Sequence, residues 1–202
     1  QKTADEIGLG MPAEPLFRSA SKKRYWRKLN NIAQELLSCS DEGIPDLIAL
    51  CEVENDSVMR DLTKRSLLRN AGYDYLMSSS PDQRGIDVAL LYSPFTFAPI
   101  RSYPIRVEPI KDMRATRDIL YVCGETVSGD TLHVFVVHQP SKFGGEKHTR
   151  PFRQLVADRV CQSVDSIYAV SPDAKLMISG DFNDAADGYS LQLYYQHHLQ
   201  TS

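Results

Sequence analysis

The chain has no stretch of apolar residues long enough to cross a membrane, since a membrane span needs roughly 18 or more apolar residues in a row. We therefore expect no transmembrane segment. The first residues also lack the pattern of a signal peptide, and the sequence is compatible with removal of a signal upstream of residue 1. Internal repeats and low-complexity segments are absent as well, so the 202 residues are expected to form one soluble domain.

Cysteine is sparse, and neither sign of charge dominates. The four cysteines are widely spaced and form no Cys-x-x-Cys pair, so a zinc site is not expected. Cys51 and Cys123 lie in apolar, strand-like runs, where a free thiol behaves as a small hydrophobic group. The net charge of −3 gives no electrostatic basis for tight, sequence-independent binding of nucleic acid. Nucleic acid is thus a partner that the charge does not indicate but does not exclude.

Residues 1–20 show no periodicity, which predicts a loop or a poorly ordered tail before a domain at 21–202. Helices are predicted at 21–37, from residue 55 or 56 to about 70, and at 146–168. Strands are predicted at 46–51, 73–78, 86–92, 95–107, 117–125, 131–138 and 174–180. This order predicts an α/β fold with a mixed sheet and helices packed on its outer face.

The most informative motif follows the last predicted strand. Gly180-Asp181-Phe182-Asn183 places a carboxylate and an amide two residues apart, so both side chains point the same way if the strand continues. Gly180 lets the backbone turn at this point. Asp and Asn are also typical of turns stabilised by local hydrogen bonds. The motif alone therefore indicates either a turn or a site for a phosphate or a metal.

Polar residues end two other apolar runs. Glu52 follows the run at 46–51, and His138 follows the run at 132–137. A hard cation such as Mg²⁺ prefers oxygen ligands, often one or two carboxylates with water and substrate phosphate, so Glu52 suits a metal ligand. Each residue also has a simpler interpretation: Glu52 as an acid in the first turn of a helix, and His138 as a structural histidine. Their coincidence with Asp181 at equivalent strand ends favours a site.

Charged residues begin two further strands. Asp87 opens a very apolar strand, where a carboxylate is costly to bury without a partner, and a catalytic histidine needs an acidic group to orient it. Arg117 opens another strand, and its guanidinium could bind a phosphate. The alternative for Arg117 and Asp118 is a surface ion pair that adds little to stability.

A basic cluster lies on the first predicted helix, between Lys22 and Lys28. Basic and aromatic side chains together could contact a nucleic-acid backbone. On a helix, such a cluster is more typical of a solvated face.

Taken together, these segments resemble the endonuclease/exonuclease/phosphatase superfamily of deoxyribonuclease-like, metal-dependent phosphoesterases. The resemblance covers about residues 22–190, and the matching segments occur in the superfamily's order. They are Cys51-Glu52-Val53-Glu54-Asn55, Arg84-Gly85-Ile86-Asp87-Val88-Ala89-Leu90, Thr116-Arg117-Asp118, Val137-His138-Gln139-Pro140-Ser141 with Gly144-Gly145, and Gly180-Asp181-Phe182-Asn183.

The resemblance implies a four-layer α/β sandwich with mixed, mainly antiparallel sheets, and Mg²⁺-dependent hydrolysis of a phosphate ester, with Mn²⁺ or Ca²⁺ as substitutes. A phosphodiester is the favoured substrate, in a nuclease-like reaction or on a small phosphoester. By position, Glu52 would be the metal ligand and Asp181 would orient or deprotonate the attacking water. Asn183 would hold the scissile phosphate, and Arg117 would contact it. His138 would stabilise the phosphoryl oxygens, with Asp87 fixing its tautomer.

Two elements of the superfamily pattern have no counterpart in the sequence. The resemblance implies a first strand carrying a metal-site Asn and a last strand carrying an Asp-His pair, and neither occurs here. We therefore expect the chain to be a fragment that is incomplete at both ends. The alternative function is a non-catalytic binding or scaffold protein with a degraded phosphoesterase site.

Overall fold

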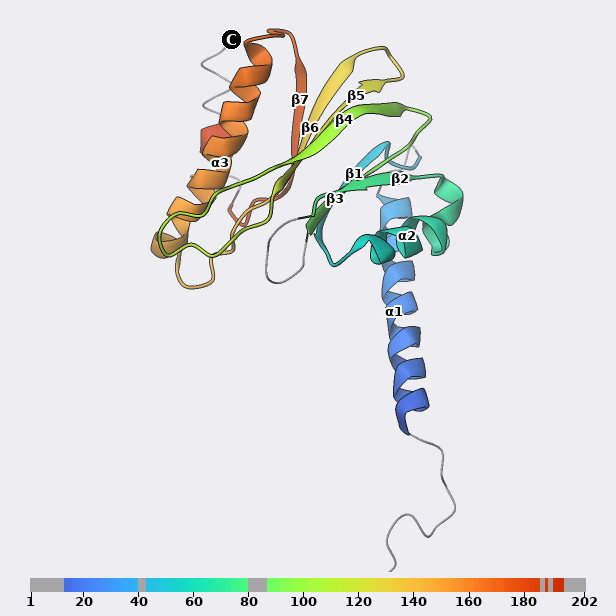
Figure 1. The fold of residues 1–202 in the computed structure, drawn as a ribbon. Helices are drawn as coiled ribbons and strands as arrows, with labels where there is room; N and C mark the ends of the chain where they lie inside the picture. Colours follow the sequence, from blue (N-terminus) through green and yellow to red (C-terminus); the bar gives the residue numbers. More distant parts are fainter. Residues whose placement is uncertain (1–12, 40–42, 80–86, 186–187, 189–190, 195–202) are drawn as a thin grey trace, which may run out of the picture.

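The computed structural model describes residues 13–39, 43–79, 87–185, 188 and 191–194. Two β-sheets lie face to face, and helices cover the outer face of each sheet (Figure 1). The chain is therefore an α/β protein with four layers, which confirms the predicted fold class.

The first sheet is antiparallel and small. In spatial order its strands are β1 (Leu47–Val53), β3 (Asp87–Tyr92) and β2 (Asp74–Met77). The central strand β3 is apolar after Asp87, as is typical of a strand with both faces buried. Ala89 and Leu91 pack beneath the helices, whereas Val88 and Leu90 face the second sheet.

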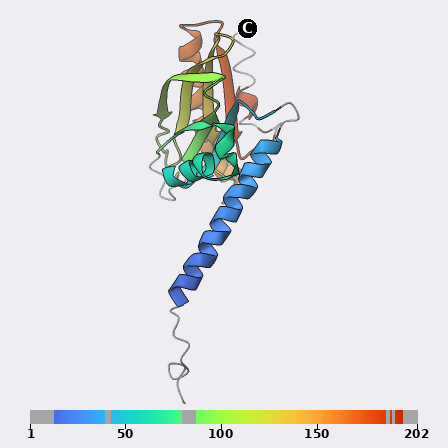
Figure 2. The same cartoon turned by 90° about the vertical axis from the view of Figure 1, so that its right-hand side faces the viewer.

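Three helical segments cover the outer face of this sheet. They are α1 (Ala13–Ser38), α2 (Asp56–Lys64) and the 3-10 segment η2 (Leu67–Ala71). Leu29 and Ala33 of α1 are buried in the core that α2 and η2 share with the sheet. The N-terminal part of α1 extends beyond the body of the molecule (Figures 1 and 2), and the cations between Lys22 and Lys28 are exposed.

The second sheet is mixed. In spatial order its strands are β4 (Phe97–Ile105), β5 (Ile119–Thr126), β6 (Thr131–His138) and β7 (Lys175–Asp181). The first three strands are antiparallel to their neighbours, whereas β7 is parallel to β6. A parallel pair needs a long crossover, and helix α3 (Glu146–Tyr168) supplies it, with Val156 and Val160 buried against the sheet.

A third cluster of apolar side chains fills the space between the two sheets. Along β6, Val134 and Val136 face this cluster. Because side chains alternate along a strand, His138 continues the same face at the end of β6. This alternation places the polar strand ends at the edge of a buried apolar layer.

Two predicted helix boundaries differ from the structure. Residues 13–20 belong to α1, so the loop predicted there is wrong, and residues 1–12 lie outside the described chain. Pro15 did not prevent this early start, because proline is tolerated in the first turn of a helix. The second predicted helix ends at Lys64 and continues as η2, because the Ser66 hydroxyl accepts a hydrogen bond from the backbone N–H of Leu68 at 3.0 Å.

None of the described helices is both long and apolar enough to span a membrane.

Candidate active site

Strands β6 and β7 end side by side, in a register that places His138 opposite Asp181. One pair earlier, Gly180 lies opposite Val137 with a φ of 140°. A Cβ at Gly180 would lie 1.9 Å from the carbonyl oxygen of Val137. Only glycine allows this close approach and this backbone conformation, so Gly180 fixes how the two polar residues are presented.

The Asp181–Asn183 segment is a turn. The backbone N–H of Asn183 donates to Oδ1 of Asp181 at 2.8 Å, and Asn183 has a φ of 48°. The Asn183 amide Nδ2 donates to the carbonyl of Gln139 at 2.8 Å, which ties the turn to the segment after β6. The interpretation of the motif as a turn is thus confirmed. A turn here is compatible with a site, because an ionised carboxylate can accept about four hydrogen bonds and Asp181 therefore keeps capacity for a ligand.

His138 and Asp181 differ in their access to solvent. The side chain of His138 is 3 % exposed, whereas that of Asp181 is 53 % exposed, and Nε2 of the one lies 3.8 Å from Oδ2 of the other. This distance is too long for a hydrogen bond. A buried imidazole therefore lies beside a carboxylate that solvent or a ligand can reach.

Glu52 occupies a bulge at the end of β1. The pairing of β1 with β3 shifts between Leu50 and Val53, and Glu52 has a φ of 60°. The strand therefore continues two residues beyond the predicted end at Cys51, and the bulge turns the exposed Glu52 side chain out of the regular alternation. Bulges next to active sites commonly redirect a side chain in this way.

Cys51 joins the two sheets at this edge. Its thiol donates to the carbonyl of Val137 at 3.7 Å. Burial raises the pKa of this thiol, and a hydrogen bond from the backbone of Asp181 lowers it. The charges of Asp181, Arg117 and Glu52 also act on its pKa. Cys51 thus lies where the charges of Glu52, Asp181 and Arg117 all act, whereas the sequence indicated only a small apolar residue in a strand.

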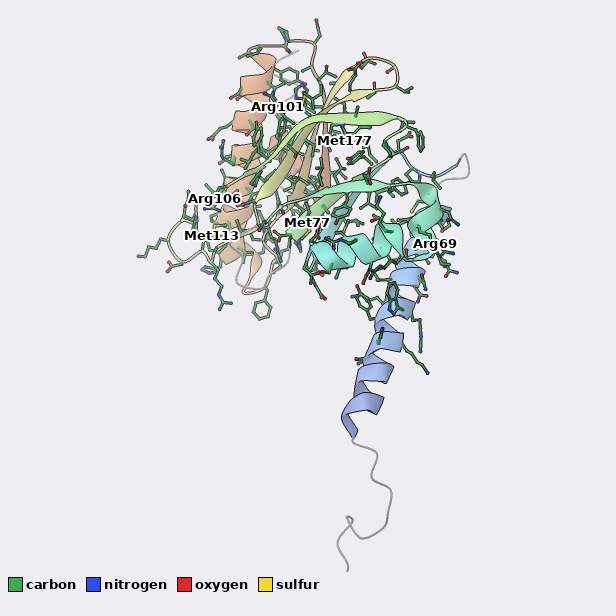
Figure 3. The ribbon with its side chains drawn as sticks, turned by 45° about the vertical axis from the view of Figure 1, so that its right-hand side comes forward. Arg69, Met77, Arg101, Arg106, Met113 and Met177 are labelled. Carbon is green, nitrogen blue, oxygen red and sulfur yellow. The ribbon has the colours of Figure 1, made fainter. Side chains whose placement is uncertain are left out.

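Arg117 and Asp118 are both buried and directly precede β5, which begins at Ile119 rather than at the predicted residue 117. The interpretation of this pair as a surface ion pair is therefore wrong. The carboxylate of Asp118 lies 3.7 Å from Nε of Arg106, which follows β4 (Figure 3). Burial raises the pKa of Asp118, Arg106 opposes the rise and Asp87 adds to it. The buried Asp118 was not among the predicted site residues, because its burial depends on the loop between β4 and β5.

Asp87 begins β3 and is largely buried, as its apolar strand predicted. Its carboxylate accepts a hydrogen bond from the Ser78 hydroxyl at 3.1 Å, and its charge acts on Asp118 of the opposite sheet. The tautomer-fixing role of Asp87 toward His138 stays a prediction. Residues 84–86 of the same motif lie outside the described residues.

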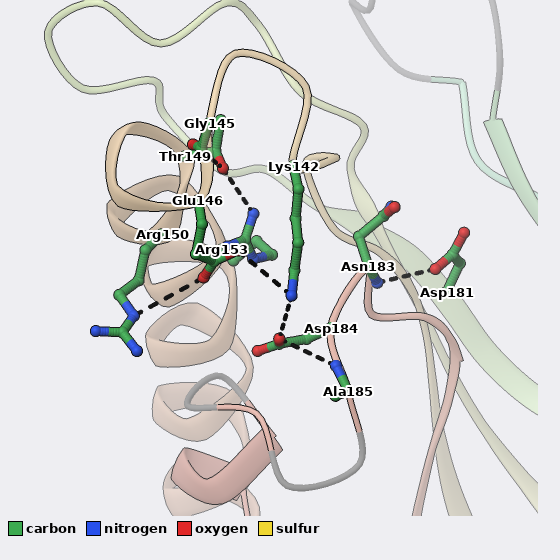
Figure 4. A network of polar contacts seen from close by, with 10 residues as sticks. All are labelled: Lys142, Gly145, Glu146, Thr149, Arg150, Arg153, Asp181, Asn183, Asp184 and Ala185. Carbon is green, nitrogen blue, oxygen red and sulfur yellow. Dashed lines mark hydrogen bonds and ion pairs between the residues drawn. The ribbon is translucent and has the colours of Figure 1, made fainter.

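A network of ion pairs holds the loop after β6 against the segment after β7 (Figure 4). Lys142 lies 2.9 Å from Asp184 and 3.3 Å from Glu146. Glu146 pairs in turn with Arg153 of α3 at 2.7 Å, and the Arg153 side chain is 1 % exposed. This network was not predicted, because its members are ordinary charged residues until the crossover brings them together.

The described donors that suit a cation at this edge are oxygens: the carboxylates of Glu52 and Asp181 and the amide of Asn183. Among the described residues, no group of three or more histidine, cysteine or acidic side chains gathers closely enough to enclose a metal ion. A magnesium ion needs no such enclosure, because it usually keeps several waters and binds through one or two carboxylates. The donor set therefore fits Mg²⁺ rather than a fully protein-bound metal.

A family model described as the Endonuclease/Exonuclease/phosphatase family matches residues 17–199. The chain belongs to this family, which confirms the resemblance seen in its motifs. A search of curated proteins found no match.

Three solved structures illustrate the shared fold. The human Nocturnin catalytic domain is 21 % identical over 84 % of this chain and 60 % of its own, with a TM-score of 0.63. D. rerio TDP2, solved with a single-strand DNA product, is 19 % identical over 80 % of this chain and 55 % of its own, with a TM-score of 0.54. The mannosyl-6-phosphatase Bt3783 of Bacteroides thetaiotaomicron is 17 % identical over 88 % of this chain and 65 % of its own, with a TM-score of 0.65. The chain thus spans about three fifths of the length of these structures.

Proposed function

We propose that the protein hydrolyses a phosphate ester, with a phosphodiester as the favoured substrate, in a reaction that depends on Mg²⁺. The observation that carries this proposal is the convergence of strand ends. The buried His138 lies beside the exposed Asp181, and the bulged Glu52 comes from a third strand, in the other sheet. The charges of Glu52 and Asp181 both act on the thiol of Cys51, which contacts the carbonyl of Val137, the residue before His138. The left-handed backbone of Glu52 and the burial of His138 beside Asp181 are features typical of functional sites.

In the proposed reaction, Asp181 takes a proton from the attacking water as the water oxygen forms a bond to phosphorus. The bond to the leaving oxygen breaks, and that oxygen keeps the electron pair and takes a proton from solvent. Asp181 suits this role because its Oδ2 is not used by the turn, which engages Oδ1. Asn183 holds a phosphoryl oxygen through its remaining N–H, since one N–H donates to Gln139. His138 and Arg117 donate to the phosphoryl oxygens and balance the negative charge that grows on them.

Glu52 is the proposed metal ligand. When bound, Mg²⁺ supplies positive charge at a phosphoryl oxygen, and Mn²⁺ or Ca²⁺ could replace it. The left-handed backbone of Glu52 supports this assignment, because strain of this kind gathers at functional sites.

The family and the names of the solved structures support phosphoester chemistry. One of these structures is a phosphatase acting on a mannosyl-6-phosphate group by its name, and another was solved with a DNA product. A nucleic acid and a small phosphoester are therefore both within the proposed substrate class.

The test is hydrolysis of bis(p-nitrophenyl) phosphate by the protein carrying this sequence, with either EDTA or Mg²⁺ in excess over the protein. We expect hydrolysis only with the metal, and a loss of about 10²- to 10⁴-fold in Asp181→Ala. Metal-independent hydrolysis, or an unchanged rate in Asp181→Ala, would contradict the mechanism. A folded protein that hydrolyses no phosphoester would favour the non-catalytic alternative.

A further inference from the structure

A hollow of about 680 Å³ opens beside the candidate active site. Its walls are the loop at 112–116, the loop at 140–144 and the first turns of α3. Figure 3 shows Met113 of the first loop beside the lower end of α3. The volume lies within the usual range for small-molecule sites, roughly 300–1,000 Å³.

The walls combine aromatic and apolar groups with a few polar ones. Met113, Phe143 and Phe152 supply apolar surface, and Arg114 and His148 supply polar groups. The rings of His148 and Phe152 meet edge to face, with centroids 5.3 Å apart. Ligand sites typically have this composition, because apolar walls give affinity and a few polar groups fix orientation.

Phe143 is the most unusual residue of the hollow, because its side chain is 93 % exposed. A ring that stays in solvent gains no free energy from burial, so packing within the described part of this chain does not explain its presence. Its loop is nevertheless held on both sides. Lys142 forms ion pairs with Asp184 and Glu146, and its carbonyl accepts a hydrogen bond from the backbone of Gly145 at 3.0 Å.

The hollow is lined by two segments of the chain that lead directly into the candidate active site. Thr116 lines it and directly precedes Arg117, and Pro140 lines it two residues after His138. Asn183 bonds to Gln139, the residue before Pro140, so a ligand with its phosphate at Asn183 could extend its organic part into the hollow.

We propose that this hollow binds a nucleobase of the substrate, stacked on Phe143. This inference rests on the proposed function, and it narrows the substrate class to nucleotide phosphoesters. A base suits the hollow because every base has a planar face that stacks on an aromatic side chain, without a need for specific hydrogen bonds. Arg114 and His148 lie where they can meet the polar edge of the base or a neighbouring phosphate.

Binding can be tested without catalysis, because the chain has a single tryptophan, Trp26, which lies on α1. The double variant Trp26→Phe/Phe143→Trp carries its only tryptophan at the hollow. We expect thymidine 5′-monophosphate to quench this fluorescence in a saturable way and 2-deoxyribose 5-phosphate, which lacks the base, to leave it unchanged. The matched control is Trp26→Phe/Phe95→Trp, because Phe95 is also an exposed phenylalanine, at 82 %, but lies between β3 and β4.

Hydrolysis provides the second readout. We expect Phe143→Ala to lower kcat/KM for thymidylyl-(3′,5′)-thymidine by about 5- to 140-fold, the effect of losing one base–aromatic stack. The control substrate is the same dinucleotide with an abasic sugar in place of the thymidine whose base is proposed to stack on Phe143. Phe143→Ala should leave kcat/KM for this substrate unchanged. Equal losses on both substrates would overturn the inference.

The two readouts separate the inference from the proposed function. Base-dependent quenching without hydrolysis of any phosphoester would retain the hollow as a nucleotide site and reject the enzymatic proposal. Hydrolysis combined with no quenching, or with equal quenching by the baseless phosphate, would reject the hollow alone. A blue shift of the tryptophan at position 143 with phosphatidylcholine vesicles, but no response to nucleotide, would also overturn the inference and assign Phe143 to a lipid surface.

Discussion

The imidazole Nε2 of His138 lies 3.8 Å from Oδ2 of Asp181, across the parallel pair of strands β6 and β7. Two side chains this close, acting on one phosphate, should behave as a unit, because losses at coupled residues do not add. We therefore expect His138 and Asp181 to act together on the phosphate, in addition to the role that each has alone.

The first prediction tests this coupling. We expect His138→Gln and Asp181→Asn each to lower kcat/KM by about 10²- to 10⁴-fold, and the double variant to lose less than the product of the two. Steady-state kinetics on a phosphodiester would measure all four proteins. Fully multiplicative losses would show that the two side chains act independently.

The second prediction concerns Glu52. Because Glu52→Gln removes the charge and keeps the shape, we expect half-maximal activity to need at least about tenfold more Mg²⁺. A titration of activity against the metal measures this shift. The control is Glu54→Gln, which changes an exposed acid two residues along the chain and should leave the titration unchanged. An unshifted midpoint in Glu52→Gln would reject Glu52 as the ligand.

The third prediction concerns Gly180. We expect Gly180→Ala to lower the free energy of unfolding by at least about 3 kcal/mol, because a Cβ there meets the backbone of Val137 and the φ is unfavourable. Gly129→Ala is the matched control, since Gly129 also has a positive φ but has nothing within 4 Å of the added Cβ. It should cost only about 1 kcal/mol. Urea unfolding of both variants checks the difference, and equal costs would contradict the steric argument.

The fourth prediction follows from the raised pKa of the buried Asp118. A folded-state pKa above the unfolded value, which is about 3.9, means that the folded protein binds the proton more tightly. The free energy of unfolding therefore falls as the pH rises between these two pKa values. Asp118→Asn removes this dependence, so its stability relative to wild type should increase as the pH rises from about 4 toward neutral.

Asp130 provides the control of opposite sign. Hydrogen bonds from Lys175 and Ser128 lower the pKa of Asp130, so its contribution to stability is present above the unfolded pKa and is lost as the pH falls through the folded one. Asp130→Asn should therefore lose stability relative to wild type as the pH rises. Urea unfolding at a series of pH values would measure both variants. A parallel response of the two would contradict the assignment for Asp118.

The fifth prediction concerns the ion pairs around Glu146. Arg153 is buried and depends on Glu146 for its charge partner, so we expect Glu146→Gln to destabilise the fold by about 1–3 kcal/mol. Arg150→Gln breaks an exposed pair with the same carboxylate at 4.0 Å and should cost less than about 0.5 kcal/mol. Equal effects of the two variants in thermal unfolding would show that burial of Arg153 is not what makes Glu146 important.

Local sequence patterns predicted most helices and strands, because apolar core residues recur with the period of a helix or of a strand. The helix at 146–168 and the strand at 131–138 have the predicted bounds. The break after Lys64 was missed because Ser66 competes for backbone hydrogen bonds inside an otherwise helical pattern. The start of α1 was missed because residues 13–20 have no clear apolar periodicity.

For the candidate site, too, local sequence patterns predicted some residues and missed others. His138, Asp181 and Glu52 were predicted because each follows an apolar run in sequence. The bulge at Glu52, the thiol contact of Cys51 and the burial of Arg117 and Asp118 depend on how the two sheets pack. No pattern within one segment contains that information, which is why the Lys142 network was also absent from the predictions.

The close approach of Gly180 to Val137 also limits how β7 can align with β6. If β7 slipped by one residue in either direction, Ser179 or Asp181 would bring a Cβ to the position where only a hydrogen fits. The same slip would turn all the side chains of β7 to the opposite face of the sheet. The smallest residue at this edge thereby selects one strand alignment, the one that sets Asp181 beside His138.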